Sequence, residues 1–208
     1  MAANELKTRV TTPVARLSYP ALFRYAEVMN EGDVPKYQCE LIFPKSTDIS
    51  ELKEAVQNAI KNKFGNKAPA NLRLPFRDGS ERTDDSGNVR DGYDNSVFIC
   101  PRSTDKPGVV IGRNKEPVVN ESDVYGGCYV RVSVTAYYYE KGKMSKGIAF
   151  ALNHVWKLRD GEPFASRISA EDDFEGVDVD DSEFDEDAYY DENDGGSASG
   201  NGGGHALI

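Results

Sequence analysis

The stretch CYVRVSVTAYYYEKGKMSKGIAFALNHVWKL, residues 128–158, decides the fold, because apolar and polar residues alternate along most of it. A period of two is the pattern of a half-buried β-strand. In the first half, one face collects Cys128, Val130, Val132, Val134 and Ala136. After a polar turn at residues 140–143, the apolar side of a second strand collects Ile148, Phe150, Leu152, His154, Trp156 and Leu158. The stretch predicts a long β-hairpin with a basic tip, in which His154 is a packed core histidine.

Shorter strand candidates lie before this hairpin, and each ends at Pro, Gly, Asn or Asp. They are residues 6–18, 37–43, 97–101 and 109–112. Residues 48–64 instead repeat apolar side chains at helical spacing, with Ser46, Thr47 or Asp48 available as a cap and Gly65 as a stop. Residues 65–93 have no clean period and predict a long surface loop. Several short strands with one helix favour a mainly β barrel or sandwich.

Charge divides the chain into two parts. Fourteen of the 24 residues from Glu171 to Asp194 are acidic, and no Lys or Arg follows Arg167. Of the 25 basic and 35 acidic residues in the whole chain, residues 1–170 hold 25 and 21, a net charge of +4, against −14 for residues 171–208. We expect one folded domain over residues 1–170 and a disordered acidic, Gly-rich tail over 171–208. Such a polyanion can compete with a nucleic acid for the cationic surface of the domain.

Other features narrow the class of protein. No apolar run approaches the roughly 20 residues that cross a bilayer, so we expect a soluble, intracellular protein without a membrane partner. Cys39, Cys100 and Cys128 are far apart, flank apolar residues and form no CxxC pair, which favours buried free thiols. Neither a metal site nor a cofactor is expected.

Aromatic and basic residues are interleaved, as the binding of unpaired bases requires: cations neutralise the backbone and aromatic rings stack on the bases. Four groups have this pattern. They are Arg16, Tyr19, Arg24 and Tyr25; Lys36 and Tyr37; Arg73, Phe76 and Arg77; and Tyr129, Arg131, Tyr137 and Tyr139. The lysines of the hairpin tip, Lys141, Lys143 and Lys146, extend the set, and all sixteen are predicted DNA-binding residues.

Packing is the alternative role for these aromatic residues, because aromatic side chains are enriched in strands. We favour packing for Phe23, Phe43, Phe98, Phe150 and Trp156. The outward hairpin residues, Tyr129, Arg131, Tyr137 and Tyr139, could equally pair with a second subunit in a homodimer. Arg73 and Arg77 could equally stabilise turns.

Enzymatic chemistry has weaker support. The acids Asp78, Glu81, Asp84, Asp85, Asp91 and Asp94 could serve a two-metal nuclease or resolvase, but Asp beside Gly is also an ordinary turn residue. The sequence has no GxSxG, GxxxxGK[ST] or HExxH motif. A non-catalytic protein is therefore favoured, and an acidic DNA mimic is the other alternative.

Several blocks of the sequence resemble the single-stranded DNA-binding proteins of tailed bacteriophages. They are RLSYPALF (16–23), KYQCELIFPK (36–45), LPFRDG (74–79), VYGGCYVRVSVTAYYY (124–139), KGIAFALNHVWKLRDGEPF (146–164) and SAEDDF (169–174). The resemblance covers residues 6–174. It implies an OB-fold, a five-stranded Greek-key barrel that holds an oligonucleotide, with an added helix and a long insertion.

The resemblance also implies a biological setting. It points to a virus-encoded protein in the cytoplasm of an infected bacterium, with a role in DNA replication, recombination or repair. It further implies an acidic C-terminus that recruits replication proteins such as a polymerase, helicase or primase. One departure concerns that last role. Many tails of this kind end in acids and an aromatic residue, whereas this chain ends in a Gly/Ser linker and His205, Ala206, Leu207 and Ile208.

Overall fold

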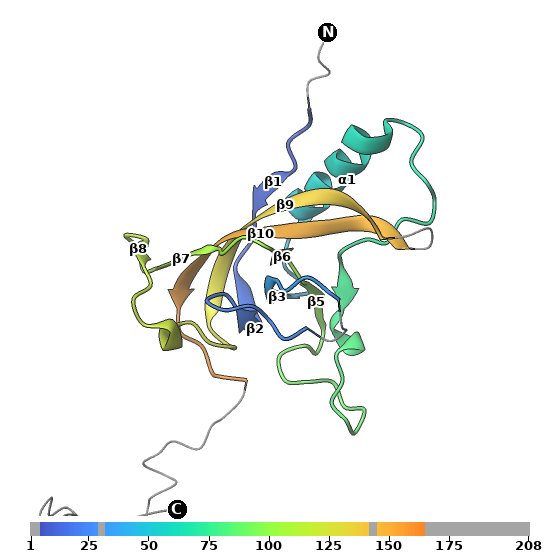
Figure 1. Cartoon of the computed structure of the whole chain (residues 1–208). Coiled ribbons are helices and arrows are strands. Elements are labelled where there is room, and N and C mark those ends of the chain that lie inside the picture. Colours follow the sequence, from blue (N-terminus) through green and yellow to red (C-terminus); the bar gives the residue numbers. More distant parts are fainter. Residues whose placement is uncertain (1–4, 29–31, 142–144, 165–208) are drawn as a thin grey trace, which may run out of the picture. The chain divides into compact units, whose positions relative to one another are not determined.

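Two long antiparallel strands form the predicted hairpin: β9 (Tyr129–Lys141) and β10 (Ser145–Arg159) (Figure 1). The computed structural model of the chain describes residues 5–28, 32–141 and 145–164. The predicted acidic tail, residues 171–208, and Lys143 at the hairpin tip lie outside the described residues.

Five strand positions close into a barrel. β2 (Ala15–Ala21) pairs with β9 and with β3 (Tyr37–Pro44), and β3 pairs with β5 (Ser96–Ile99) and β6 (Arg102–Ser103). β6 pairs in parallel with β10, and β10 returns to β9. β5 and β6 occupy one position and are separated by Cys100 and Pro101, where proline lacks the N–H that a strand donates. The ring β9–β2–β3–β5/β6–β10 is an OB-type barrel, and the mainly β prediction is confirmed.

The remaining elements extend this barrel at its edges. The predicted strand over residues 6–18 is divided at Pro13 into β1 (Arg9–Thr11) and β2. The sheet is completed by β4 (Arg77–Asp78), β7 (Gly108–Ile111) and β8 (Glu116–Pro117), and two 3-10 turns are present, η1 (Gly79–Glu81) and η2 (Glu121–Asp123). β7 pairs with β10 and lengthens the sheet beyond the barrel.

The predicted helix is confirmed as α1 (Ser50–Phe64). Asp48 accepts a hydrogen bond from the Ser50 N–H at its start. The helix ends at Gly65, whose φ of +58° is easier for glycine than for other residues. Its buried side chains, Leu52, Ala55, Val56 and Ala59, join the barrel core, while Lys53, Lys61 and Lys63 on the opposite side are exposed.

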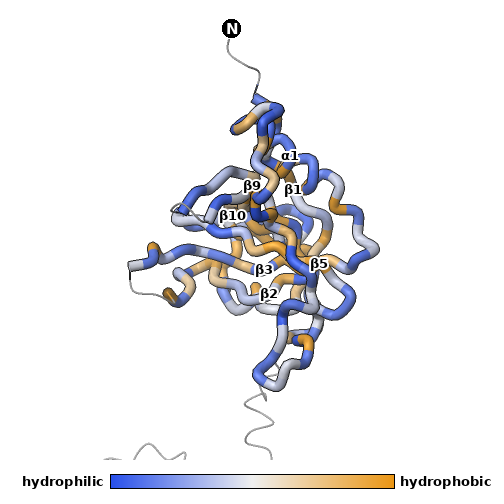
Figure 2. Tube along the Cα trace, turned by 90° about the vertical axis from the view of Figure 1, so that its right-hand side faces the viewer, coloured by the Kyte–Doolittle hydropathy of each residue, from blue (hydrophilic) through white to orange (hydrophobic). Residues whose placement is uncertain are grey.

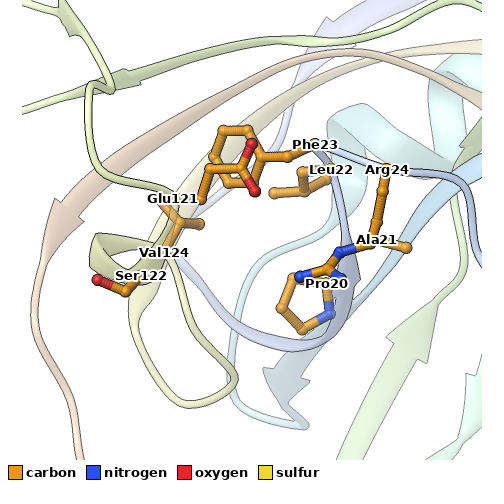
Figure 3. Close-up of a pocket in the computed structure, with 8 residues that line it drawn as sticks. All are labelled: Pro20, Ala21, Leu22, Phe23, Arg24, Glu121, Ser122 and Val124. Atoms are coloured by element: carbon orange, nitrogen blue, oxygen red, sulfur yellow. The ribbon is translucent and has the colours of Figure 1, made fainter. Parts of the chain in front are cut away.

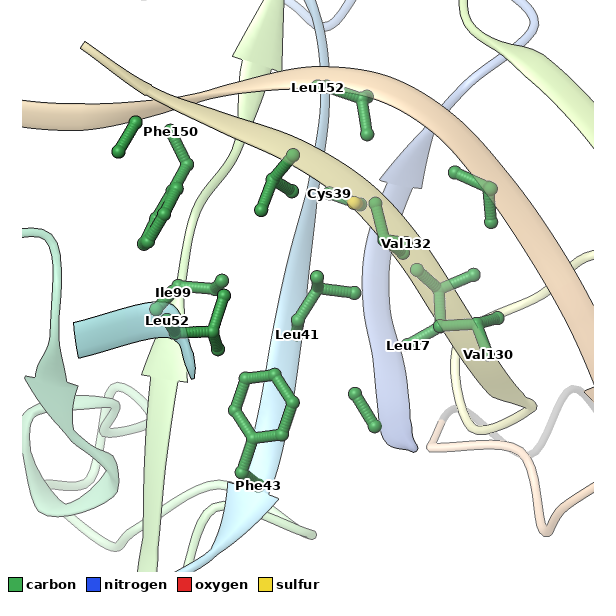
Figure 4. Close-up of a cluster of buried hydrophobic side chains, with 14 of the residues drawn as sticks. Leu17, Cys39, Leu41, Phe43, Leu52, Ile99, Val130, Val132, Phe150 and Leu152 are labelled. Carbon is green, nitrogen blue, oxygen red and sulfur yellow. The ribbon is translucent and has the colours of Figure 1, made fainter. Parts of the chain in front are cut away.

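The core lies inside the barrel and is built from alternate residues of its strands. Figure 4 shows Leu17, Leu41, Val130 and Val132 facing one another from β2, β3 and β9. Burying a side chain of this size contributes about 1.5–3 kcal/mol, so alternation sets the direction in which each strand faces. Along the chain, hydrophobic stretches run through the interior and hydrophilic ones form the outer loops (Figure 2).

A β-bulge in β10 overturns part of the predicted core face. Leu152 pairs with Val134 but His154 pairs with Ser133, so Asn153 is an extra residue. An extra residue reverses which side chains face inward. Val155 and Lys157 therefore point inward and are buried, whereas His154 is exposed. The prediction that His154, Trp156 and Leu158 continue the face of Ile148, Phe150 and Leu152 is wrong, because a period of two cannot reveal an inserted residue.

Hydrogen bonds and an ion pair offset the cost of burying the Lys157 ammonium. Its ammonium donates to the Asp123 carbonyl and forms an ion pair with Asp160 at 2.7 Å. The Tyr125 hydroxyl donates to the same Asp160 carboxylate at 3.0 Å. This group fastens η2 to the end of β10.

Burial of the predicted packing residues is mostly confirmed. Phe43, Phe98 and Phe150 are buried, and Phe23 is partly buried against the core. Cys39 and Cys128 are buried as predicted, whereas Cys100 is only partly buried. Within the described ranges, the structure contains no helix of the length and apolar character needed to span a membrane.

Candidate nucleic-acid interface

The segment between β2 and β3 and the turn between β9 and β10 meet at the tip of the hairpin. The segment between β2 and β3 reaches the hairpin tip, where Asp33 forms an ion pair with Lys141 at 2.8 Å. Counted along the OB barrel, this segment joins strands one and two, and the hairpin tip joins strands four and five. In OB-folds these two loops, with the face of strands two and three, hold oligonucleotides. The candidate interface is therefore expected at the tip of the β9–β10 hairpin.

Two tyrosines stack where the segment between β2 and β3 closes. The ring centroids of Tyr25 and Tyr37 are 4.5 Å apart with an angle of 40° between the planes. The loop is closed by a hydrogen bond from the Ala26 N–H to the Lys36 carbonyl. Tyr25 remains 50% exposed. Desolvation and the neighbouring Tyr25 raise the pKa of Tyr37, so the Tyr37 ring stays neutral at physiological pH.

Tyr137 and Tyr139 lie on the outer face of β9, as the alternation predicts. Tyr137 pairs with Ala149, and Tyr139 pairs with Gly147 on β10. The residues opposite are small, and Tyr137 is 38% exposed, whereas Tyr139 is partly buried. Burial raises the pKa of Tyr137, with a further increase from Tyr139 and a decrease from the nearby Arg102 guanidinium.

Arg73 reaches this face from the long loop. It forms an isolated β-bridge with Gly147, and the Ile148 N–H donates to its carbonyl at 2.8 Å. A Cβ atom on Gly147 would stand only 2.4 Å from the Arg73 carbonyl oxygen. Glycine is therefore required for the loop to pair closely with β10, and Gly147 lies between Tyr139 on β9 and Arg73, whose side chain is exposed.

Arg102 belongs to the same surface but is absent from the residues that the sequence pattern selected. It pairs with Gln38 on β3 and with Ala151 on β10, and Ala151 pairs with Thr135. Its side chain is exposed. No aromatic residue adjoins Arg102 in sequence, so the interleaved pattern of aromatic and basic residues does not include it. Arg102 follows Pro101 directly, at a strand position whose side chain faces outward. That position is the signal in the sequence that could have identified it.

We use the name tyrosine face for a group of residues at this end of the barrel. Its members are Tyr25, Lys36, Tyr37, Arg73, Arg102, Tyr137, Tyr139, Lys141 and Lys146. Tyr37 is partly buried against the core, and Lys146 pairs with Glu140 on the side of β10 that carries Ile148. Eight of the nine are among the sixteen predicted DNA-binding residues. The structure thus brings together half of that prediction and adds Arg102.

Arg16 and Tyr129 lie at the opposite end of β9 and are surrounded by other groups. The guanidinium of Arg159 is 3.4 Å from the centre of the Tyr129 ring, and that of Arg16 is 5.6 Å away. Arg16 also donates to the Gly127 and Glu162 carbonyls and lies 4.3 Å from the centre of the Phe164 ring. These contacts hold residues 159–164 against the barrel.

Tyr19 and Arg77 lie near a buried carboxylate on the outside of β3. Glu40 is buried, accepts a hydrogen bond from the Tyr93 hydroxyl and forms an ion pair with Arg82. The Arg82 guanidinium lies 5.2 Å from the centre of the Tyr19 ring, and Arg77 pairs with Glu81 at 3.0 Å. Arg82 is a second residue that the sequence pattern missed, and it anchors the long loop.

The other predicted residues lie apart. Phe76 is partly buried and packs edge to face on Phe150, with ring centroids 6.0 Å apart. Arg131 is exposed on the outer face of β9 beside Trp156. Arg24 is exposed and lines a pocket of about 240 Å³ with Pro20, Ala21, Leu22, Phe23, Glu121, Ser122 and Val124. Figure 3 shows this pocket between residues 20–24 and residues 121–124, and no other predicted DNA-binding residue lines it.

Acids of the long loop serve local structure. Asp78 caps η1, pairs with Lys45 at 2.7 Å and has its pKa lowered to about 2 by that lysine and by Ser80. Asp84 accepts hydrogen bonds from the Ser86 and Asn88 N–H groups. Within the part of the chain that the structure describes, no three His, Cys, Asp or Glu side chains are grouped to hold a metal ion.

Comparisons with known proteins show the family to which this chain belongs. A family model described as the ssDNA-binding protein of Enterobacter phage Enc34 matches residues 8–187. A "putative protein p50" of Acyrthosiphon pisum secondary endosymbiont phage 1 is 32% identical over 161 residues, which cover 72% of this chain and 82% of the relative.

Two solved structures of phage single-stranded DNA-binding proteins have folds similar to that of this chain. The single-stranded DNA-binding protein from bacteriophage Enc34, in complex with ssDNA, is 26% identical with a TM-score of 0.63, covering 78% of this chain and 97% of that one. The single-stranded DNA-binding protein gp2.5 of bacteriophage T7 has a TM-score of 0.52 and covers 93% of this chain and 100% of that one. At 14% identity, gp2.5 is a likeness of fold alone.

Proposed function

Since this chain belongs to the family of the Enterobacter phage Enc34 ssDNA-binding protein, we propose that it binds single-stranded DNA, largely independently of sequence and without catalysis. The structure of the Enc34 protein in complex with ssDNA supports this proposal.

The tyrosine face is the observation that carries the proposal. It gathers four tyrosines with Lys36, Arg73, Arg102, Lys141 and Lys146 at the loops and strands that hold oligonucleotides in OB-folds. Stacking a base on an aromatic ring contributes about 1–3 kcal/mol and tolerates any base, because every base has a π-face. Lysine and arginine side chains neutralise phosphates and release condensed counterions. Together these interactions favour sequence-tolerant binding of unpaired strands.

The acidic tail supplies regulation in this proposal. A net charge of −14 on residues 171–208 is attracted to a domain of net charge +4 and competes with DNA for its cations. Displacement of the tail by DNA then frees it to recruit replication proteins. We place this activity in phage DNA replication, recombination or repair, in the cytoplasm of the infected bacterium.

Binding is tested by titrating a labelled poly(dT) oligomer with the full chain at low salt and following anisotropy. We expect binding that weakens linearly in log–log form as salt rises, with a slope of about −0.7 for each phosphate contact. An absence of binding at low salt would reject the proposal and favour the DNA mimic. Sedimentation of the protein alone at the same concentrations tests whether the tyrosine face instead joins two subunits.

Regulation by the tail is tested by deleting residues 171–208. The truncated chain should bind oligonucleotides more tightly and discriminate less between single strands and duplex. Equal affinity of the two chains would reject competition by the tail while leaving DNA binding intact. Incubating labelled single-stranded and branched DNA with Mg²⁺ or Mn²⁺ tests the nuclease alternative, which requires product that Asp84→Asn abolishes.

A further inference from the structure

The bulge at Asn153 places Trp156 on the outer face of β10. Val155 and Lys157 on either side are buried, so Trp156 points away from the core. Its neighbour on β9 is Arg131, which faces outward between the fully buried Val130 and Val132. An aromatic ring and a guanidinium therefore lie side by side on the outside of the hairpin.

The turn between β7 and β8 fixes the indole ring. The Trp156 Nε1–H donates to the Gly112 carbonyl at 2.7 Å, which holds the ring edge against the turn. The Lys115 ammonium lies 4.9 Å from the ring centre, and Arg113 is exposed in the same turn. The ring is thus preorganised in one orientation, with cations around it.

These cations have no acidic partner in the described part of the chain. No ion pair joins Arg113, Lys115 or Arg131 to any described carboxylate, although Glu116 lies in the same turn. Uncompensated positive charge beside an aromatic face is the combination that binds single-stranded nucleic acid. We call Lys115, Arg131 and Trp156 the indole patch.

The indole patch is continuous with the tyrosine face. Tyr137 and Arg131 lie on the same outer side of β9, six residues or about 20 Å apart. The outward residues between them are small or polar, namely Ser133, Thr135, Ala151, Asn153 and His154. Asn153 donates to Thr135 Oγ1 at 3.0 Å, which keeps its amide flat against the sheet. No bulky side chain of these two strands interrupts the surface between the two places.

We propose that the indole patch is a second contact for the same DNA strand. The strand leaves the tyrosine face, follows the outer side of β9 and β10, and stacks a base on Trp156 while adjacent phosphates contact Arg131 and Lys115. Lys115 moves from the ring face to a phosphate when the base arrives. This inference rests on the proposed function and extends it from the loops of the barrel to the opposite half of the hairpin.

The single tryptophan of the chain provides the test. Oligo(dT) chains of about 4 to about 16 nucleotides, the range of site sizes for single OB-folds, are titrated into the full chain. Anisotropy of the labelled DNA reports binding at the tyrosine face, and tryptophan fluorescence reports arrival at the indole patch. We expect the shortest oligomers to bind without quenching and longer ones to quench. Binding at every length with unchanged tryptophan fluorescence would overturn the inference.

Substitutions separate the two contacts. For the longest oligomer, Arg131→Ala and Lys115→Ala should each make the salt dependence of binding shallower by about 0.7 in slope. For the shortest oligomer, both substitutions should leave the slope unchanged. Lys61→Ala is the matched control, because it removes an exposed lysine on α1. Equal slopes in both variants and the original chain would overturn the inference. Failure of the proposed function looks different, because then no oligomer of any length binds.

Discussion

Tyr129 and Tyr137 occupy the same face of the same strand, yet their surroundings differ. At one end of β9, Tyr129 is covered by the guanidinium groups of Arg159 and Arg16, and Arg16 is engaged with the Gly127 and Glu162 carbonyls. At the other end, Tyr137 faces Ala149 and is 38% exposed. Tyr129 therefore contributes to the packing of the folded chain, whereas the exposed ring of Tyr137 is available to a ligand.

This difference shows what alternation determines and what it leaves open. Alternation determines the face on which each tyrosine lies. The partners of the two rings come from other segments: β2 and residues 159–164 contact Tyr129, whereas Ala149 of β10 and Arg102 of β6 lie near Tyr137. The two ends should therefore respond oppositely to the same substitution.

Removing the rings of Tyr137 and Tyr139 together should have the largest effect. Tyr137→Ala with Tyr139→Ala should weaken binding to poly(dT) by about 2–4 kcal/mol, because each ring stacks on a base for about 1–3 kcal/mol. This corresponds to a rise in Kd of about 30-fold to about 1,000-fold, measured by anisotropy. The melting temperature should change little, because both rings lie outside the core.

Phenylalanine provides the control for that result. Tyr137→Phe with Tyr139→Phe keeps the π-faces and should bind within a few-fold of the original chain. Unchanged affinity of the alanine double variant would remove the tyrosine face from the DNA path and leave the comparison without a functional meaning.

Tyr129 should show the opposite response. Tyr129→Ala should lower the free energy of unfolding by about 1–3 kcal/mol, because it removes a ring packed against two guanidinium groups. DNA affinity should change less than threefold at a temperature where both chains are folded. Chemical denaturation measures the stability, and Tyr129→Phe should restore it. A loss of affinity equal to that of the Tyr137 variant, at unchanged stability, would show that the two ends do not differ.

Local patterns predicted much of the fold. The hairpin, α1 and the strand at residues 37–43 follow from periodicity and from stop residues such as Gly65. The bulge at Asn153 could not be predicted, because the apolar residues after it fit the unbroken period as well as before. Its consequences, a buried Lys157 and an outward Trp156, were therefore missed.

The candidate site was predictable only in part, for a related reason. Interleaving of aromatic and basic residues located Tyr25, Tyr37, Tyr137 and Tyr139. It could not separate them from Tyr129, whose partners are set by tertiary contacts. It also missed Arg102, which reaches the tyrosine face only because β6 pairs with both β3 and β10.

Arg102 should give a smaller, electrostatic effect at the tyrosine face. Arg102→Ala should reduce the salt slope of DNA binding by about 0.7 and raise Kd by less than about tenfold at moderate salt, as expected for one lost phosphate contact. Lys53→Ala, on the exposed side of α1, should leave the slope unchanged. Identical slopes for the two variants would exclude Arg102 from the DNA path.

The smallest expected effect is a pH dependence of stability at the Tyr129 end of β9. There Asp160 pairs with Lys157 and accepts a hydrogen bond from the Tyr125 hydroxyl. The Lys157 ammonium and the Tyr125 hydroxyl lower the pKa of Asp160 in the folded chain. A lowered pKa contributes stability above the unfolded value of about 3.9, and that contribution is lost as pH falls through the folded value.

The Asp160→Asn variant should therefore have a slightly lower melting temperature than the original chain at pH about 7, and the difference should shrink below pH about 4. Asp85→Asn, an exposed acid in the long loop, is the control. Asp160 and Tyr129 lie beyond Arg131 and Trp156, where the proposed DNA path ends, so the substitution should leave poly(dT) affinity at neutral pH unchanged. A loss of affinity would mean that the DNA path continues past the indole patch to the Tyr129 end of β9.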